Sequence, residues 1–195
     1  QKPDFDLAAL QAGDRAEFAH FVEAYSGQVY RLGLKMLQNP QDAEDILQET
    51  FIKAYKALPN FEGRSSLSTW LYRIATNEAL MFLRKKRPEQ ISVDEPIEND
   101  EGDERPRQII DWCCLPESEL MSTEARANLD HSVQKLPESL RAVFLLREIE
   151  GLSTRETAEV LDISESAVKT RLSRARFRLR ELLSAYYSER MPSAT

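Results

Sequence analysis

Apolar residues recur every three to four positions over two long stretches of the 195-residue chain. This period is that of amphipathic helices, which bury one face and expose the other. Between the two stretches, residues 88–108 combine three prolines with a run of acidic residues and little apolar content, a composition typical of the flexible linker that we expect over residues 88–118. The pattern therefore predicts an all-α protein of two small helical domains, residues 1–87 and 119–190, joined by a flexible acidic linker.

Turn and capping residues divide the first domain into helices. Gly13 and Asp14 are expected to end a short first helix and to cap a second helix that runs toward Leu37. Asn39 and Pro40 then have the identities of an N-cap and a first helical residue. A long amphipathic helix is expected to follow, with an apolar face made of Ala43, Ile46, Leu47, Phe51, Ala54, Tyr55 and Leu58.

The polar face of this long helix contains one isolated apolar residue. Ile52 lies among Asp45, Gln48 and Glu49. A single exposed isoleucine needs no functional explanation, yet an apolar side chain with a polar rim is also a common form of protein-binding site. The residues alone leave both interpretations open.

A loop and a further helix complete the first domain. The loop is expected to display Phe61, and the helix is expected to begin near Ser65 or Ser66, with Trp70 at the border of its apolar face. Rings that stack on bases and cations that hold phosphates suit single-stranded nucleic acid. On composition alone, burial of both aromatic rings in the core is the simpler interpretation. The apolar face of the helix is expected to comprise Leu67, Leu71, Ile74, Met81 and Phe82.

The second domain contains two helical segments joined by a short turn. Ser153 and Glu156 have the spacing of a capping box that opens the first segment. After a turn at residues 162–164, Ser164 is placed to cap the second segment. This arrangement is that of a DNA-binding helix-turn-helix.

The second helix of this motif contains VKTRLSRARFRLREL. It carries six positive charges between Lys169 and Arg180, although the whole chain has a net charge of -7. Early turns of a recognition helix face base edges, and later cations reach phosphates. A solvated basic face is the plain alternative, but the preceding turn favours DNA binding, with Arg174 a candidate for bidentate contact with guanine. The buried stripe is expected to be Val168, Leu172, Ala175, Leu179 and Leu182.

Three segments, taken in order, resemble one bacterial family. DAEDILQETFIKAYKAL, FEGRSSLSTWLYRIATNEAL and the helix-turn-helix are similar in order and spacing to the extracytoplasmic-function (ECF) sigma factors of RNA polymerase, closest to the sigma-E/AlgU-like branch. The resemblance covers nearly the whole chain except the linker. It implies a sigma-2 domain at residues 1–87, which binds core polymerase and the -10 element, and a sigma-4 domain at residues 119–190, which binds the -35 element.

The resemblance also implies a role for individual residues. The surface implied to dock on the coiled coil of the polymerase β′ clamp comprises Asp45, Gln48, Glu49 and Ile52. The residues implied to contact the -10 strand, where a flipped base would be captured, are Phe61, Arg64, Ser65, Ser68, Trp70, Arg73 and Asn77. The residues implied to read the -35 duplex are Lys169, Thr170, Ser173 and Arg174, with Arg147, Arg155 and Arg176 on phosphates.

Two positions depart from the family's pattern. Trp70 matches the first of two tryptophans that wedge DNA open in housekeeping sigma factors, but Leu71 stands at the second position. This departure implies weaker melting and a stricter demand on the promoter. Ser173 stands where the family often carries a bulkier or aromatic side chain, so the resemblance does not fix which bases are read.

Composition and resemblance together favour a binding protein over an enzyme. The sequence shows no nucleotide-binding loop, metal cluster or nucleophile constellation, and no cofactor is expected. The two cysteines, Cys113 and Cys114, are adjacent, which is not a disulfide framework and favours a cytoplasmic location. No apolar run approaches the roughly 18 residues of a membrane span, so no direct membrane insertion is expected.

The resemblance implies three partners. They are core RNA polymerase, through its β′ clamp coiled coil and β flap; promoter DNA, as -35 duplex and -10 single strand; and an anti-sigma factor, often membrane-bound, in a stress or envelope response. Two alternatives stay open. A stand-alone helix-turn-helix regulator usually dimerises, and the sequence shows no dimerisation element. A sigma mimic that sequesters an anti-sigma factor carries a receiver domain, which this sequence lacks.

Overall fold

Helices account for all the regular secondary structure in the part of the chain that the computed structural model describes, residues 5–86 and 123–188. The predicted all-α class is confirmed, and the predicted linker lies outside the described residues. The first unit contains α1 (Leu7–Gln11), α2 (Arg15–Leu37), α3 (Pro40–Ala57), the short 3-10 turn η1 (Leu58–Asn60) and α4 (Leu67–Lys86). The second unit contains α6 (Thr123–Gln134), α7 (Glu138–Phe144), a π-helical turn η3 (Leu145–Ile149), α8 (Thr154–Leu161) and α9 (Glu165–Ser188).

The predicted caps of the first unit are present. The Asp14 carboxylate accepts hydrogen bonds from two backbone amides in the first turn of α2, each at 2.9 Å. The Asn39 side chain does the same for α3, with Pro40 at its first position. Between these helices, Gln38 adopts a left-handed conformation with a φ of 61° and ends α2. These local contacts fix where α2 ends and α3 begins.

The core of the first unit is built by α2, α3 and α4. Phe21, Met36 and Leu71 are almost completely buried in it. The helices α2 and α3 approach closely at Gly33, where an added Cβ would lie 3.5 Å from the Cα of Ala43. Burial of this apolar surface is the main source of stability for such a small helical unit.

Two residues expected on buried faces are exposed. Tyr55 of α3 is 42% exposed, and Met81 of α4 is 45% exposed. Instead, α4 buries Thr69, Tyr72 and Thr76. The difference has a tertiary cause, because α4 packs against α2 and α3 and also against α8 of the second unit.

The predicted helix-turn-helix is confirmed. The Ser153 hydroxyl accepts from the Glu156 amide at 3.1 Å, and the Glu156 carboxylate accepts from the Ser153 amide at 2.8 Å, which completes the capping box of α8. Asp162, with a φ of 54°, ends α8, and the Ser164 hydroxyl then accepts a hydrogen bond at the start of α9. The stripe predicted on α9 is buried at Val168, Leu172, Ala175 and Leu179, and Leu182 is half-buried.

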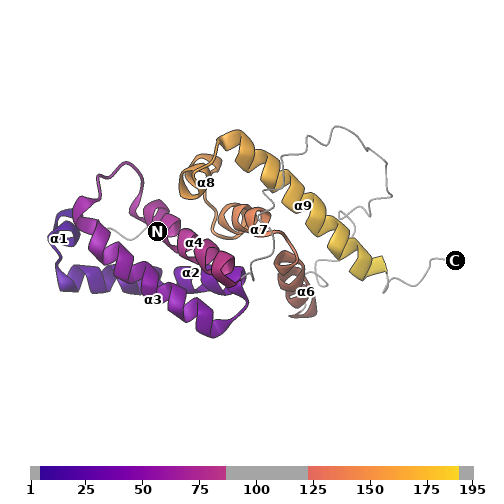
Figure 1. The fold of residues 1–195 in the computed structure, drawn as a ribbon, viewed down its shortest axis with the longest axis horizontal. Coiled ribbons are helices and arrows are strands. Elements are labelled where there is room, and N and C mark those ends of the chain that lie inside the picture. Colours follow the sequence, from indigo (N-terminus) through magenta and orange to yellow (C-terminus); the bar gives the residue numbers. More distant parts are fainter. Residues whose placement is uncertain (1–4, 87–122, 189–195) are drawn as a thin grey trace.

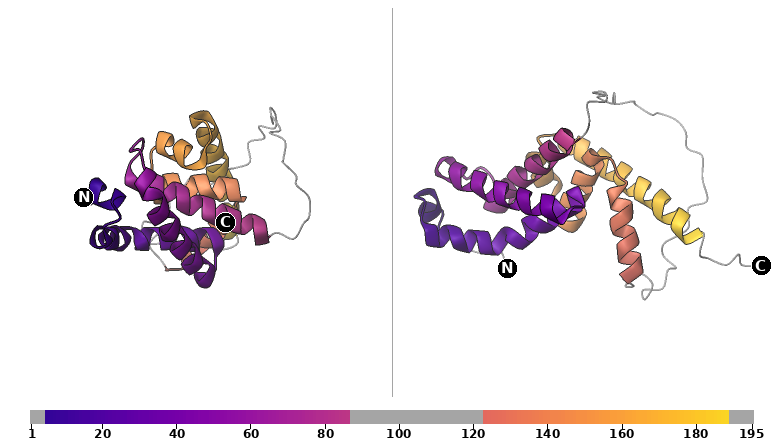
Figure 2. Two further views of the ribbon diagram at one scale, coloured as in Figure 1. Left: turned by 60° about the vertical axis from the view of Figure 1, so that its left-hand side comes forward. Right: turned by 60° about the horizontal axis from the view of Figure 1, so that its bottom comes forward.

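The two units lie against each other, with α8 beside the first turns of α4 (Figures 1 and 2). A second contact joins the end of α2 to α6 and α7. There the Lys35 ammonium lies 2.7 Å from the Asp130 carboxylate, and the Arg141 guanidinium donates to the Met36 carbonyl at 2.7 Å. The sequence had predicted two domains but not how they are arranged.

Candidate nucleic-acid interface

The polar face of α3 is presented to solvent. Asp45, Gln48 and Glu49 are exposed, and Ile52 is 46% exposed on the same face, one turn further on. The structure therefore brings together all four residues of the predicted polymerase-binding surface. An exposed apolar side chain surrounded by acidic and amide groups has the anatomy of a small protein-docking site.

The loop before α4 differs from its prediction at Phe61. The loop was expected to display this ring, but Phe61 is only 8% exposed, and its ring centroid lies 5.1 Å from that of Trp70. The Gln11 side chain also donates to the Phe61 carbonyl at 2.8 Å. Phe61 is thus packed against Trp70. The prediction that the loop displays this ring is wrong, and burial of the ring, the simpler interpretation from composition, holds for Phe61.

The other predicted -10 residues divide into two groups. Trp70, which is half-buried, shares one face of α4 with Arg73 and Asn77, both of which are exposed. In the preceding loop, Arg64 is exposed and pairs with Glu62, and Ser65 is half-buried. Ser68 lies apart from that face, because its side chain lines a cavity between the two units.

The helix-turn-helix carries an open groove of about 460 Å³ beside α9. Four of the predicted -35 residues, Arg147, Lys169, Ser173 and Arg176, line it. Phe177, which is 57% exposed, and Arg180 line it as well, and the sequence analysis did not assign them to the site. The helical period could have predicted Arg180, since positions 169, 173, 176 and 180 fall on one face of α9.

The remaining -35 residues lie outside the groove. Thr170 and Arg174 are exposed one turn apart on a neighbouring face of α9, and the Thr170 hydroxyl donates to the Ser166 carbonyl at 3.0 Å. Arg155 is exposed on α8 and pairs with Glu159 at 3.2 Å. The recognition helix therefore has two polar faces, one within the groove and one beside it.

Two cations of the groove already have partners in the protein. Arg176 pairs with Glu148 at 2.7 Å, and Arg147 donates to the Leu152 carbonyl. Exposed ion pairs contribute little stability, typically less than about 1 kcal/mol. Exchange of Glu148 for a DNA phosphate would therefore cost the protein little.

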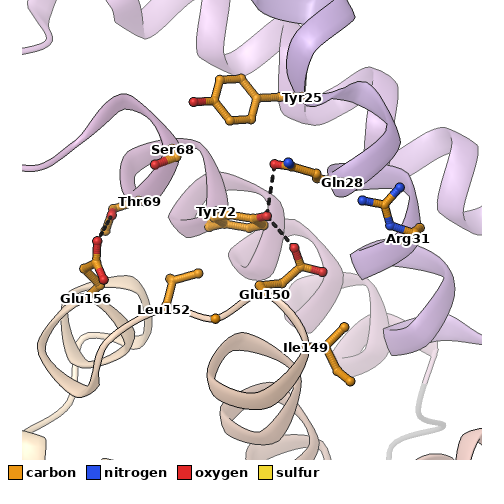
Figure 3. Close-up of a pocket in the computed structure, with 11 residues that line it drawn as sticks. Tyr25, Gln28, Arg31, Ser68, Thr69, Tyr72, Ile149, Glu150, Leu152 and Glu156 are labelled. Carbon is orange, nitrogen blue, oxygen red and sulfur yellow. Dashed lines mark hydrogen bonds between the residues drawn. The ribbon is translucent and has the colours of Figure 1, made fainter. Parts of the chain in front are cut away.

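The cavity between the units is a feature that sequence reasoning missed (Figure 3). It has a volume of about 390 Å³ and is lined from the first unit by Tyr25, Gln28, Arg31, Ser68, Thr69 and Tyr72, and from the second by residues 149–152 and Glu156. The Tyr72 hydroxyl donates to the Glu150 carboxylate and lies 3.2 Å from the Gln28 side-chain oxygen. Burial, together with the Glu150 carboxylate, raises the pKa of Tyr72 well above its ordinary value, so the hydroxyl keeps its proton at neutral pH.

Both units match known protein families. Residues 21–89 match Sigma-70 region 2, and residues 126–179 match Sigma-70, region 4. The chain is 39% identical over 177 residues to the ECF RNA polymerase sigma factor SigW of Bacillus subtilis, covering 91% of this chain and 94% of SigW. It is 38% identical over 170 residues to the ECF RNA polymerase sigma-E factor of Escherichia coli K12, covering 86% of each protein.

This chain is an ECF sigma factor of the sigma-70 family. The predicted resemblance is therefore confirmed, and so is the expectation of a transcription-initiation protein rather than an enzyme. Among solved structures, the sigma factor is similar to CnrH in complex with the cytosolic domain of CnrY, with a TM-score of 0.66 and 25% identity over 92% of this chain and 95% of that one. The sigma factor RpoE of Bartonella quintana, in complex with the anti-sigma factor NepR, shares the fold with a TM-score of 0.61, 22% identity and coverage of 86% of this chain and 96% of that one.

The described residues contain neither a candidate membrane span nor a candidate metal site. Within residues 5–86 and 123–188, no helix is both long and apolar enough to cross a membrane. In the same ranges, no group of three or more histidine, cysteine or acidic side chains has an arrangement that could hold a metal ion.

Proposed function

We propose that this sigma factor docks on core polymerase through α3 and reads two promoter elements through α4 and α9. The single observation that carries the proposal is the joint exposure of three separate surfaces in the order that the family requires. They are the apolar-centred polar face of α3, the aromatic and cationic face of α4, and the cationic groove along α9.

The α3 surface is proposed to bind the coiled coil of the β′ clamp. Its support is that Ile52 is 46% exposed on the same face as Asp45, Gln48 and Glu49, all of them exposed. An apolar anchor of this kind dominates the affinity of many protein interfaces. The β flap is the expected partner of the sigma-4 region.

The α4 surface is proposed to hold the non-template strand of the -10 element. Trp70 provides a ring for base stacking, and Arg73 and Asn77 extend the same face toward the strand. The loop residues Arg64 and Ser65, with Ser68 on α4, complete the proposed site. Phe61 supports Trp70 from below, and direct contact of Phe61 with a base would require its ring to leave the buried position.

The α9 surface is proposed to read the -35 duplex. Lys169, Thr170, Ser173 and Arg174 lie on the early turns of the recognition helix, where side chains reach base edges in the major groove. The cations Arg147, Arg155 and Arg176 surround them and are proposed to bind phosphates, which position the duplex without reading sequence.

An anti-sigma factor is the proposed regulator, in the cytoplasm or held at a membrane by that regulator. The support is that RpoE of Bartonella quintana, which shares the fold, was solved with the anti-sigma factor NepR. CnrH, to which this chain is similar over 92% of its length, was likewise solved with a bound partner, the cytosolic domain of CnrY. A stress or envelope-response regulon is proposed from the same family relationship.

Run-off transcription with purified core polymerase tests the proposed function. We expect the chain to bind core and to direct initiation from a subset of promoters in a fragmented genome of its source. Specific binding to DNA in the absence of core, with no core binding and no initiation, would instead identify a stand-alone helix-turn-helix regulator. Binding to an anti-sigma factor without binding to core would identify a sigma mimic.

A further inference from the structure

We propose that Phe177 is a base-reading residue, whose ring packs against the C5-methyl group of a thymine at one edge of the -35 element. The ring is 57% exposed, which makes it the most exposed large apolar side chain in the part of the chain that the structure describes. The inference rests on the proposed function, because it adds one contact, with a named chemical partner, to the proposed -35 surface.

Phe177 lies on the side of α9 opposite the buried stripe. An α-helix turns by about 100° per residue, so position 177 points roughly 170° away from the mean direction of the stripe. The stripe itself is buried at Val168, Leu172, Ala175 and Leu179. The ring of Phe177 therefore adds nothing to the core of the second unit, and its replacement should leave the fold intact.

The same geometry places Phe177 among the residues that are proposed to read bases. Around the helix axis it falls between Ser173, about 40° to one side, and Arg174, about 60° to the other. Thr170 lies between the directions of Phe177 and Arg174, and all four side chains are exposed. Phe177 therefore continues the proposed base-reading face of α9 by one further turn.

The surroundings of the ring indicate which ligand it meets. A single exposed apolar side chain needs no partner, but Phe177 lines the groove of about 460 Å³ together with the cations Arg147, Arg176 and Arg180. Duplex DNA complements both kinds of group, since its phosphates bind cations and the thymine methyl group is apolar. A protein partner would instead have to supply an apolar group surrounded by acidic side chains.

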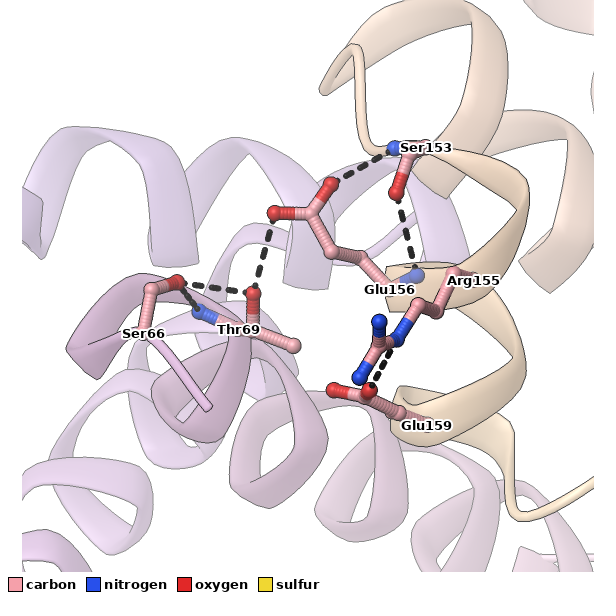
Figure 4. Close-up of polar contacts among 6 residues, drawn as sticks. All are labelled: Ser66, Thr69, Ser153, Arg155, Glu156 and Glu159. Atoms are coloured by element: carbon pink, nitrogen blue, oxygen red, sulfur yellow. Dashed lines mark hydrogen bonds and ion pairs between the residues drawn. The ribbon is translucent and has the colours of Figure 1, made fainter. Parts of the chain in front are cut away.

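Neighbouring side chains are placed to hold a duplex close to the ring. Arg176 precedes Phe177 directly, Arg180 follows within one turn, and both are exposed. From the other helix of the motif, Thr154 lines the same groove, and the capping box of α8 fixes its first turn in place (Figure 4). Phosphates bound by the two arginines would bring the edge of a base pair over Phe177.

The spacing along α9 predicts which base pair is contacted. Phe177 follows Ser173 by four residues, a rise of roughly 6 Å, and successive base pairs are about 3.4 Å apart. Phe177 would then lie about two base pairs beyond the one that Ser173 faces. Thymine is the expected base at that position, because its C5-methyl group is the apolar group that the major groove presents.

Selection from a promoter library tests the proposal. The -35 region is randomised in a promoter that wild-type holoenzyme transcribes, and the templates that yield run-off transcript are sequenced. Wild type is compared with Phe177→Ala, with Phe177→Leu and with Leu129→Ala, a control at a residue that is 37% exposed on α6 and does not line the groove. We expect a thymine preference at one edge of the selected sequence, which Phe177→Ala loses and Phe177→Leu retains in part.

Removal of the methyl group itself gives the sharper test. Deoxyuridine at the selected thymine keeps the base pair and lacks only the C5-methyl group. From the value of one buried methyl group, we expect wild-type holoenzyme to bind this duplex about three- to fivefold more weakly than the thymine duplex. Phe177→Ala holoenzyme should bind the two duplexes equally, within about 1.5-fold, whereas the Leu129→Ala control should match wild type.

The other outcomes separate the role of Phe177 from the proposed function. Equal sensitivity to deoxyuridine in wild type and Phe177→Ala, or no thymine preference in wild type, would overturn the proposal. A loss of initiation by Phe177→Ala that is the same for every -35 sequence would also overturn it and would assign the ring to a protein partner. Failure of the wild-type holoenzyme to initiate from any promoter would instead overturn the proposed function.

Discussion

The two proposed DNA surfaces differ in how ready they are for their ligand. The groove along α9 is open, and Lys169, Ser173 and Arg180 lie exposed beside it. The proposed -10 site on α4 is only partly open, because Ser68 and Thr69 face the second unit. The structure therefore leaves the proposed -35 surface open and covers part of the proposed -10 surface.

The largest effect is expected at a third surface, the proposed polymerase-binding face of α3. Ile52→Asp would place a charge at the centre of the exposed α3 face, and removal of such an anchor typically costs at least about 2 kcal/mol of binding energy. We expect core affinity, measured by fluorescence anisotropy, to fall about thirtyfold or more. Leu129→Asp is the control, since Leu129 is 37% exposed on α6 of the other unit. An equal loss of core affinity in both variants would show that the exposed face of α3 is not the polymerase-binding site.

Base reading by α9 is expected to have the next largest effect. Arg174→Ala should cost about 1–3 kcal/mol against the preferred -35 sequence and little against a scrambled one. Competition between promoter variants in run-off transcription measures the difference, with core affinity as the internal control. A uniform loss across all -35 sequences would show that Arg174 contacts phosphate only.

Arg180, which lines the open groove beside α9, is expected to bind a DNA phosphate. Arg180→Ala should weaken holoenzyme binding to -35 duplex about equally for all sequences and reduce the magnitude of the salt slope by about one. Arg178→Ala is the matched control, because Arg178 pairs with Glu181 at 3.3 Å and does not line the groove. An unchanged salt slope for Arg180→Ala would exclude this residue from the DNA contact.

A smaller effect is expected at the second contact between the units. Arg141→Lys retains the charge but loses the planar fork that reaches carbonyls of both units. We expect the free energy of unfolding, measured in urea, to fall by about 1–3 kcal/mol. A fall of that size with unchanged run-off activity would separate stability from function at this position, whereas no change in stability would mean that the Arg141 hydrogen bonds contribute little.

Local signals predicted most of the fold. The caps at Asp14, Asn39 and Ser153 depend on side chains within three residues of the amides they accept from, and each was found where the sequence placed it. The buried stripe of α9 was predicted from the spacing of its apolar residues, which is also a local feature of the sequence. Short-range capping and periodicity therefore carried the helix boundaries and the helix-turn-helix.

Long-range packing decided what the sequence could not predict. The burial of Tyr72 depends on contacts of α4 with segments of the second unit more than 70 residues later in the chain. Phe61 is buried because Trp70 covers it, which a loop sequence does not reveal. The cavity between the units left no signal, since its residues come from segments with no common pattern.

Energy transfer between the two units tests the central claim most directly. Dyes at Glu23→Cys on α2 and Arg178→Cys on α9, both exposed positions, report the separation of the units in a protein that carries Cys113→Ser and Cys114→Ser. We expect one population with high transfer in the free protein and a clear fall in transfer when core polymerase and promoter DNA are added. The same separation in the free protein and in the promoter complex would contradict it.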